Sequence, residues 1–247
     1  MISMRKLYAV QAIICDLDGT LIDSAEDLRA ALNVALNAAG LRSIEADEIR
    51  SMIGDGVPKL VERALVAVGG DLEQKSALVA RFLEIYEANP LGLTRCYPGV
   101  IETLDRLYTH FRLAVATNKP VIAAKRILRG LSLDGLFSVV VGGDSLPRRK
   151  PDPAPLLEVL RQFAIGADQA ILVGDNMHDV EAAHAAGMCC VAVSYGYHHR
   201  PPAELHADRV IDRFDDLLSL VIDSSPDSPI EQRSEPIPPA SRPESRP

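Results

Sequence analysis

Five short runs of apolar residues recur along the chain, and helix-like patterns separate most of them. Each run is nearly continuous in Ile, Leu, Val, Ala or Cys, as expected of strands that helices cover on both faces. The runs span residues 10–15, 112–116, 138–141, 170–173 and 189–193. Strands that alternate with helices form parallel sheets joined by crossover connections. The pattern therefore predicts an α/β fold, a Rossmann-like parallel sheet with helices on both faces.

Nearly a hundred residues separate the first two runs, and this segment has a helical pattern. Apolar stripes predict helices at residues 24–39, 45–52, 57–68 and 72–88. Ser24 and Asp27 resemble a capping box at the start of the first helix, and Asp71 is expected to cap the last one. We therefore expect an inserted all-helical cap domain over residues 24–95. The α/β core is then discontinuous and consists of residues 1–23 and 96–224.

The remaining helices are expected between the later strands and after the last one. Their patterns cover residues 100–110, 121–131, 154–163, 180–186 and 214–222. Beyond them the composition changes, because residues 225–247 hold seven of the chain's 17 prolines, five serines and few large apolar groups. Such a segment cannot bury enough apolar surface to fold, so the sequence predicts a disordered tail.

Acidic residues outnumber basic ones, with 34 Asp plus Glu against 26 Lys plus Arg and a formal net charge of −8. This balance disfavours broad binding to nucleic acid or to anionic membranes, so any bound anion must be gathered locally. The four cysteines show neither metal-binding spacing nor a disulfide framework, and no apolar run reaches membrane-spanning length. We expect a cytoplasmic protein, and both monomer and homodimer are open.

Polar and charged residues follow four of the predicted strands. In a doubly wound sheet, ligands bind outside the carboxyl ends of the strands, and parallel strands all end at one edge. Residues that are distant in the sequence can therefore converge there. The candidates are Asp16 and Asp18, Thr117 and Asn118, Lys150, and Asp175 with Asp179 beyond it.

The first of these strands ends with two aspartates that are two residues apart. In extended backbone, the side chains of Asp16 and Asp18 project to the same side. Two buried carboxylates repel each other, and a divalent cation removes that repulsion. With Asp175 as a third oxygen donor, the set suits Mg²⁺. The donors after the second and third strands would bind an anion beside the metal, which predicts phosphate chemistry.

Four segments, in this order, resemble the motifs of the haloacid dehalogenase superfamily of magnesium-dependent phosphatases: DLDGT at 16–20, VATN at 115–118, KPDP at 150–153 and VGDNMHD at 173–179. The resemblance covers nearly the whole chain before the tail. Within the superfamily, the sequence is most similar to bacterial phosphoglycolate phosphatases. That narrower likeness lies in IGDGVPKLVERAL, YPGV, TNKP, VVGGDSLPRRKPDPAPLL and VSYGYHH. It implies hydrolysis of 2-phosphoglycolate to glycolate and phosphate.

The resemblance also implies a mechanism. Asp16 would attack phosphorus and form an aspartyl-phosphate, which splits the hydrolysis into two displacements. Asp18 would protonate the leaving group and then take a proton from the attacking water. The Mg²⁺ ion would be bound by the side chains of Asp16 and Asp175 and by the backbone carbonyl of Asp18.

The resemblance assigns phosphate binding to the residues after the second and third strands: Thr117, Asn118 and Lys150. Asp179 would orient the metal's surroundings or the lysine. As a cap, the helical insertion would exclude water and contact the non-phosphate end of the substrate, with a substrate loop at Gly54 and Gly56. Beside that loop, Lys59 and Arg63 are the candidates for pairing with the substrate's carboxylate.

Other functions are open from the sequence. The nearest is a phosphatase for another small sugar or amino-sugar phosphate. A phosphomutase uses the same nucleophile, and a non-catalytic binding domain could keep the same fold. A dehalogenase would attack carbon and would not need the acid at position 18, so Asp18 and Asp175 argue against it. If the protein is a phosphatase, the expected binding partner is its substrate, a small phosphorylated metabolite.

Overall fold

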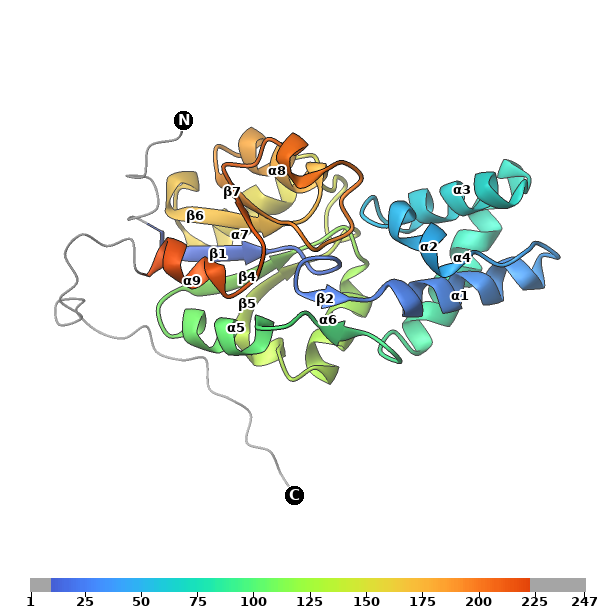
Figure 1. Cartoon of the computed structure of the whole chain (residues 1–247), viewed down its shortest axis with the longest axis horizontal. Coiled ribbons are helices and arrows are strands. Elements are labelled where there is room, and N and C mark those ends of the chain that lie inside the picture. Colours follow the sequence, from blue (N-terminus) through green and yellow to red (C-terminus); the bar gives the residue numbers. More distant parts are fainter. Residues whose placement is uncertain (1–9, 223–247) are drawn as a thin grey trace, which may run out of the picture.

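The structure is a computed structural model that describes residues 10–222 (Figure 1). The predicted tail, residues 225–247, lies outside the described residues. Six strands form one parallel sheet in the order β5-β4-β1-β6-β7-β8. They are β1 Ala12–Cys15, β4 Arg112–Ala116, β5 Phe137–Val141, β6 Ala170–Gly174, β7 Cys189–Val193 and β8 Arg209–Ile211. The predicted α/β fold with a parallel sheet is therefore confirmed.

Helices follow the positions that the apolar stripes predict. The α-helices are α1 Ala25–Ala38, α2 Ala46–Ile49, α3 Val57–Val68, α4 Lys75–Ala88, α5 Val100–Tyr108, α6 Val121–Gly130, α7 Ala154–Phe163, α8 Met177–Ala185 and α9 Asp216–Val221. Helix α8 begins three residues earlier than predicted, because Asn176 and Asp179 form a capping box. Within residues 10–222, no helix combines the length and apolarity needed to cross a bilayer.

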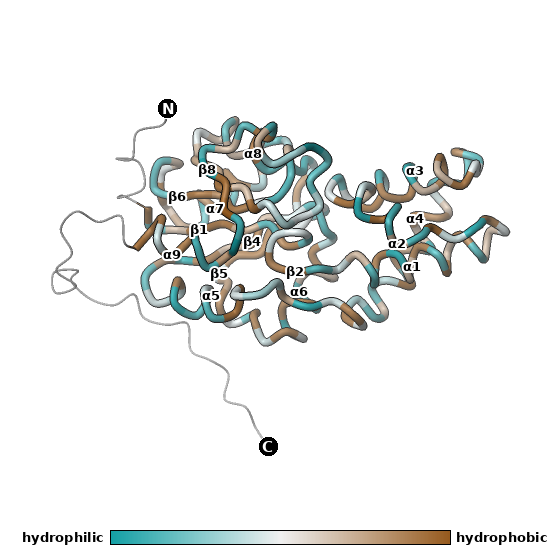
Figure 2. Tube along the Cα trace, in the orientation of Figure 1, coloured by the Kyte–Doolittle hydropathy of each residue, from teal (hydrophilic) through white to brown (hydrophobic). Residues whose placement is uncertain are grey.

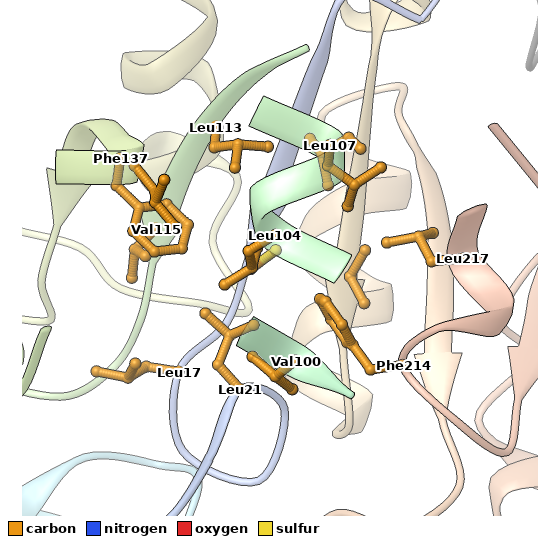
Figure 3. Close-up of a cluster of buried hydrophobic side chains, with 14 of the residues drawn as sticks. Leu17, Leu21, Val100, Leu104, Leu107, Leu113, Val115, Phe137, Phe214 and Leu217 are labelled. Carbon is orange, nitrogen blue, oxygen red and sulfur yellow. The ribbon is translucent and has the colours of Figure 1, made fainter. Parts of the chain in front are cut away.

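Each face of the sheet has its own core. Ile13 and Cys15 of β1 join a cluster that includes Leu104 of α5 and Phe214, next to α9 (Figure 3). Ile14 points to the opposite face and packs in a second cluster with residues of α7 and α8. Because side chains alternate along a strand, a continuous apolar run supplies both cores. The sheet is thus a rigid platform, and its polar chemistry is confined to the strand ends.

Strand β8 was missed by the sequence analysis. It is a three-residue strand at the edge of the sheet, and of its residues only Ile211 is buried. Two further strands, β2 Ile22–Asp23 and β3 Arg95–Cys96, pair in antiparallel fashion outside the main sheet. Such short segments with polar residues lack the apolar pattern on which strand prediction depends.

Helices α1 to α4, which we call the helical unit, lie beside the carboxyl ends of the strands (Figure 1). They have a core of their own, in which Leu32, Leu36 and Val61 are fully buried. The rings of Phe82 and Tyr86 stack there with centroids 5.4 Å apart. Brown and teal segments alternate along these helices in Figure 2, as expected for amphipathic helices that bury one stripe. The chain enters the unit after β2 and leaves it before β3.

The predicted capping box at Ser24 and Asp27 is wrong. Ser24 makes no side-chain capping bond, and its hydroxyl instead donates to Asp18 Oδ1 at 2.5 Å. Asp27 accepts from the backbone amides of residues 92–94 and from the hydroxyl of Thr94. Tertiary partners thus outcompete the local cap. Asp71 accepts from the amide of Glu73 at 2.9 Å and caps a short 3-10 helix, Leu72–Gln74. Helix α4 begins only at Lys75, with Gln74 as its N-cap, so Asp71 caps the turn before α4 and not α4 itself.

We predict that Asp27→Ala lowers the free energy of unfolding by about 2–3 kcal/mol at pH 7, because buried Thr94 loses its charged acceptor. Urea unfolding followed by circular dichroism measures this. Burial opposes ionisation of Asp27, but Thr94 and the backbone amides outweigh it and lower its pKa. The stabilisation is therefore present above the unfolded-state pKa and is lost as the pH falls through the folded-state pKa.

Glu26→Ala is the matched control, because Glu26 lies one residue away on α1 and forms a partly exposed ion pair with Arg29. We expect it to cost less than about 1 kcal/mol. Equal losses for Asp27→Ala and Glu26→Ala would contradict the assignment of Asp27 as the residue that fixes the segment leaving the helical unit.

Candidate active site

Three strands at the centre of the sheet deliver polar residues to one edge. Asp16 follows β1, Thr117 follows β4 and Asp175 follows β6, with β1 between the other two strands. The amide of Asp16 donates to the carbonyl of Val173 at 2.9 Å, which extends the pairing by one residue. The chain builds the sheet first on one side of β1 and then on the other, and ligands bind at such points of reversal.

Three carboxylates, Asp16, Asp175 and Asp179, are buried together at this edge and form what we call the carboxylate cluster. Their ligand oxygens lie within 4.8 Å of one another. Burial raises the pKa of Asp16, and the nearby Lys150 opposes that rise. Burial, Asp16 and Asp179 raise the pKa of Asp175 well above its usual value. The surroundings therefore do not fully stabilise the ionised forms of Asp16 and Asp175.

Lys150 is the ammonium group of this cluster. Its Nζ lies 2.8 Å from Asp16 Oδ1 and 2.6 Å from Asp179 Oδ1, and the residue is only 3% exposed. Burial alone would lower the pKa of Lys150, but the two carboxylates outweigh it and raise that pKa. One positive charge thus faces three carboxylates.

Backbone and side-chain donors fix the orientation of the other two carboxylates. Asp175 accepts from the Thr20 hydroxyl at 3.0 Å and from the Tyr197 amide at 2.7 Å. Asp179 accepts from the amides of Asp175 and Asn176 at 3.2 and 3.0 Å. Its second oxygen holds Lys150. Asp179 therefore positions both the lysine and the turn that carries Asp175.

The turn after β1 requires a glycine at position 19. Gly19 has a φ of +85°, a conformation that other residues rarely adopt. A Cβ atom there would also lie 2.3 Å from Asp175 Oδ2, which is inside van der Waals contact. The turn between Asp16 and β2 therefore passes against Asp175, and any side chain at residue 19 would displace that carboxylate.

Asp18 has a different environment from Asp16. Both of its carboxylate oxygens lie 2.9 Å from Lys119 Nζ, and Oδ1 also accepts from the Ser24 hydroxyl. Lys119 is 5% exposed, and its ammonium lies 4.7 Å from the centre of the Tyr86 ring. Asp16 and Asp18 thus lie at one site but pair with different lysines.

A pocket of about 40 Å³ opens between the strand ends and the helical unit. Its wall combines polar groups of the sheet edge with apolar groups of the helices: Asp16, Asp18, Thr117, Asn118, Lys119, Pro120, Leu28, Ile53, Gly54, Gly56, Val57, Leu60 and Tyr86. The hydroxyl of Thr117, a residue of this wall, accepts from the Lys119 amide at 3.2 Å. The structure thus brings six of the predicted site residues to one pocket, with Lys150, Asp175 and Asp179 beside it.

The loop of residues 53–56 docks onto the sheet edge. Asn118 Nδ2 donates to the carbonyls of Gly54 and Lys150 at 2.9 and 3.0 Å. Asp55 pairs with His178 at the start of α8, and His199 Nε2 lies 2.8 Å from the carbonyl of Ile53. The helical unit is therefore tied to the α/β core at the pocket. The side-chain amide of Asn118 organises this junction.

The two cations proposed for the substrate's carboxylate lie elsewhere. Lys59 is exposed and pairs with Glu62. Arg63 pairs with Asp55 and donates to the carbonyl of Met52. Neither residue lines the pocket. Helix α3 directs both side chains to local acceptors instead of the sheet edge.

The motifs did not assign chemistry to three residues that the structure brings to the site. Thr20 and Tyr197 hold Asp175, and Lys119 holds Asp18. Thr20 and Lys119 are within the DLDGT and TNKP segments, so their proximity to catalytic candidates was the available signal. Tyr197 comes from a loop after β7, and only the folded chain reveals that its amide reaches Asp175.

The comparisons with known proteins agree with this geometry. Residues 13–193 match the family described as haloacid dehalogenase-like hydrolase. The chain belongs to this family. It is 43% identical to a phosphoglycolate phosphatase of Rhodospirillum rubrum, over 85% of this chain and 89% of that protein. A crystal structure of a predicted phosphoglycolate phosphatase from Haemophilus somnus superposes with a TM-score of 0.81 at 34% identity, covering 89% of this chain and 99% of that one.

A more distant solved structure is CbbY from Rhodobacter sphaeroides, in complex with xylulose-(1,5)bisphosphate. It superposes with a TM-score of 0.72 at 26% identity, over 84% of this chain and 96% of that one. With the family match and phosphatase relatives at about 40% identity over most of its length, this haloacid dehalogenase-like hydrolase is a phosphatase.

Hydrolases of this family generally need a divalent metal, and the carboxylate cluster fits one. Its oxygen donors are the ligands that hard cations prefer. The raised pKa values of Asp16 and Asp175 reflect burial and mutual repulsion, which a cation would relieve. Lys150 alone leaves two carboxylate charges unbalanced, which is the charge that a divalent ion would neutralise.

We predict that Mg²⁺ stabilises the protein against thermal unfolding, by about 2.7 kcal/mol at a hundredfold excess over its dissociation constant. In Asp175→Asn, which removes one ligand charge, this stabilisation is expected to be mostly lost. Differential scanning fluorimetry with and without EDTA measures both effects. Asp168→Asn, at an exposed acid outside the cluster, is the control and should respond like the wild type. An unchanged response of Asp175→Asn would contradict metal binding at this cluster.

Proposed function

We propose that this phosphatase is a magnesium-dependent phosphomonoester hydrolase that converts 2-phosphoglycolate to glycolate and phosphate through an aspartyl-phosphate. The observation that carries this proposal is the position of Asp16, which contacts Lys150 in the carboxylate cluster and faces a small pocket shared with Asp18. The choice of substrate rests on two relatives: the R. rubrum protein is described as a phosphoglycolate phosphatase and the H. somnus protein as a predicted one.

In the first displacement, a carboxylate oxygen of Asp16 attacks phosphorus as the bond to the ester oxygen breaks. Asp18 donates a proton to that oxygen, so that glycolate leaves as an alcohol. In the second displacement, Asp18 takes a proton from water, and the water oxygen attacks phosphorus as the bond between phosphorus and Asp16 breaks. Inorganic phosphate leaves, and both carboxyl groups return to their initial states.

The remaining polar residues stabilise the transferring phosphoryl group. Lys150 supplies positive charge next to the attacking oxygen of Asp16, and Thr117 donates from its hydroxyl. Asn118 acts by holding the Gly54 carbonyl and the Lys150 carbonyl in place. Asp16, Asp175 and the backbone carbonyl of Asp18 would hold Mg²⁺, which would supply positive charge against the carboxylates and the phosphoryl group.

We assign residues 24–95, which contain the helical unit, to the role of a cap domain over a discontinuous core of residues 1–23 and 96–224. Leu28, Val57 and Leu60 of the unit line the pocket, so they exclude water from the reacting groups. Gly54 and Gly56 let the docking loop approach the core, because both have positive φ angles and lie against core residues. Opening of this loop would admit substrate.

The pocket is small, with a volume of about 40 Å³ that holds roughly three water molecules, and this supports a small ester such as 2-phosphoglycolate. Phosphatase action on another small sugar phosphate is the second candidate, and the bisphosphate bound to CbbY supports it. A purely binding role fits less well, since Asp18 and the cluster supply every group that hydrolysis needs. Phosphomutase activity uses the same nucleophile and is distinguished by its isomerised product.

We further propose that the enzyme works in the cytoplasm on a small metabolite, without nucleic acid or membrane partners, as a monomer or a homodimer. Its net charge of −8 supports this, as do its four cysteines, which form no disulfide in the part of the chain that the structure describes.

A panel of phosphate esters tests the substrate. We expect kcat/KM for 2-phosphoglycolate to exceed that for sugar phosphates by at least about tenfold, and EDTA to abolish turnover of all of them. Release of one phosphate per alcohol formed, without an isomerised product, separates hydrolysis from phosphoryl transfer to a sugar. A sugar phosphate that outranks 2-phosphoglycolate would reject the substrate assignment.

Asp16→Asn tests the nucleophile. We expect kcat to fall by about 10⁴-fold or more, because the amide cannot form the covalent intermediate. The variant should keep the wild-type circular dichroism spectrum. Trapping of ³²P on the wild-type protein by acid quenching, and its absence from Asp16→Asn, provides a second readout. Residual turnover above about a tenth of the wild-type rate would remove Asp16 from this role.

A further inference from the structure

A buried lysine in the pocket has no task in the transfer of the phosphoryl group. The ammonium of Lys119 has a side-chain exposure of 2% and lies 2.9 Å from each oxygen of Asp18. Tyr86 of the helical unit covers it from the other side at 4.7 Å. Burying an ammonium is costly, so a side chain held in this way needs a counter-charge in every state of the site.

Lys119 is also the one cation among the described residues that line the pocket. Lys150 is behind Asp16, where Asp16 and Asp179 hold it. Lys59 and Arg63 of the helical unit pair with local acids. A substrate with a second negative group, enclosed under the helical unit, therefore has Lys119 as its available counter-charge.

We propose that Lys119 is a specificity-determining residue that binds the carboxylate of the substrate. The inference rests on the proposed function and adds to it the group that recognises the acid. When the acid binds, the ammonium turns from Asp18 to the incoming carboxylate or bridges the two. The Tyr86 ring stays beside the cation and shields the pair from water.

The geometry fixes which acids suit this site. To donate its proton, Asp18 must lie within hydrogen-bond distance of the ester oxygen, about 2.6–3.2 Å. Lys119 Nζ is 2.9 Å from Asp18, so it is a near neighbour of that oxygen. In 2-phosphoglycolate, one carbon separates the ester oxygen from the carboxylate, which places the negative group within reach of Nζ.

Acids with longer spacers fit less well. An added carbon pushes the carboxylate away from Lys119 and toward the apolar wall formed by Leu28, Val57 and Leu60. That wall offers no charged partner, and burying an unpaired carboxylate there is unfavourable. The pair of Lys119 and the apolar wall therefore selects a short acid both by attraction and by exclusion.

Two substrates that differ only in charge test the proposal. 2-Phosphoglycolate and its amide, 2-phosphoglycolamide, have nearly the same shape, but only the acid carries a negative group at the far end. For Lys119→Met, we expect kcat/KM for the acid to fall by about 100-fold, mainly through KM, and that for the amide to fall by less than about tenfold. Equal losses for the two substrates would overturn the inference, because Lys119 would then act on Asp18 or on the phosphoryl group.

Lys125→Met is the matched control, because Lys125 is an exposed lysine on the neighbouring helix α6. It should leave both rates unchanged. If the Lys119→Met variant still hydrolyses the amide, its active site is folded, and a loss on the acid is then specific to the carboxylate. A further measurement needs no variant: the wild type should prefer the acid to the amide by about 100-fold, and a ratio near one would overturn the inference.

The outcomes also separate this inference from the proposed function. If a sugar phosphate outranks 2-phosphoglycolate in the panel, the proposed substrate fails. If 2-phosphoglycolate leads the panel but Lys119→Met lowers acid and amide hydrolysis alike, the substrate assignment survives and the role of Lys119 fails.

Discussion

Repulsion among buried carboxylates is the constraint that shapes this site. Asp16, Asp175 and Asp179 come from two strands and one helix, and a single ammonium, Lys150, lies among them. Backbone amides and the Thr20 hydroxyl hold the acids in place against their mutual repulsion. Such an arrangement is stable only on a rigid support, and the doubly covered sheet provides it. The packing energy of the core thus offsets the repulsion among the carboxylates.

Most of the fold could be predicted because the sheet is buried on both faces. Continuous apolar runs marked β1, β4, β5, β6 and β7, and amphipathic stripes marked the helices. Strand β8 and the pair β2 and β3 could not be found, since they are short and polar. Ser24 and Asp27 had the spacing of a capping box, yet their side chains bind Asp18 and the segment around Thr94. Local spacing is a weak guide wherever distant partners compete for the same polar atoms.

The site, like the fold, has residues that could be predicted from the sequence and residues that could not. Asp16 and Asp175 could be predicted, because parallel strands must deliver their carboxyl ends to one edge. Lys119 and Tyr197 could not be given roles from the sequence, because each depends on an approach between segments more than twenty residues apart. The choice of Lys59 or Arg63 was reasonable from their place near the docking loop. It ignored the local acids that hold them, and such pairing is visible only when side chains are placed.

Strands β2 and β3 connect the helical unit to the rest of the chain. Because the strand that leads into the unit pairs with the strand that leads out of it, the two ends of that segment are adjacent in space. A replacement segment with closely spaced ends could be grafted there without altering the register of the parallel strands. Leu28, Val57 and Leu60 of that segment form one wall of the pocket, so exchanging it would reshape this wall while Lys119 and the carboxylate cluster stay in place.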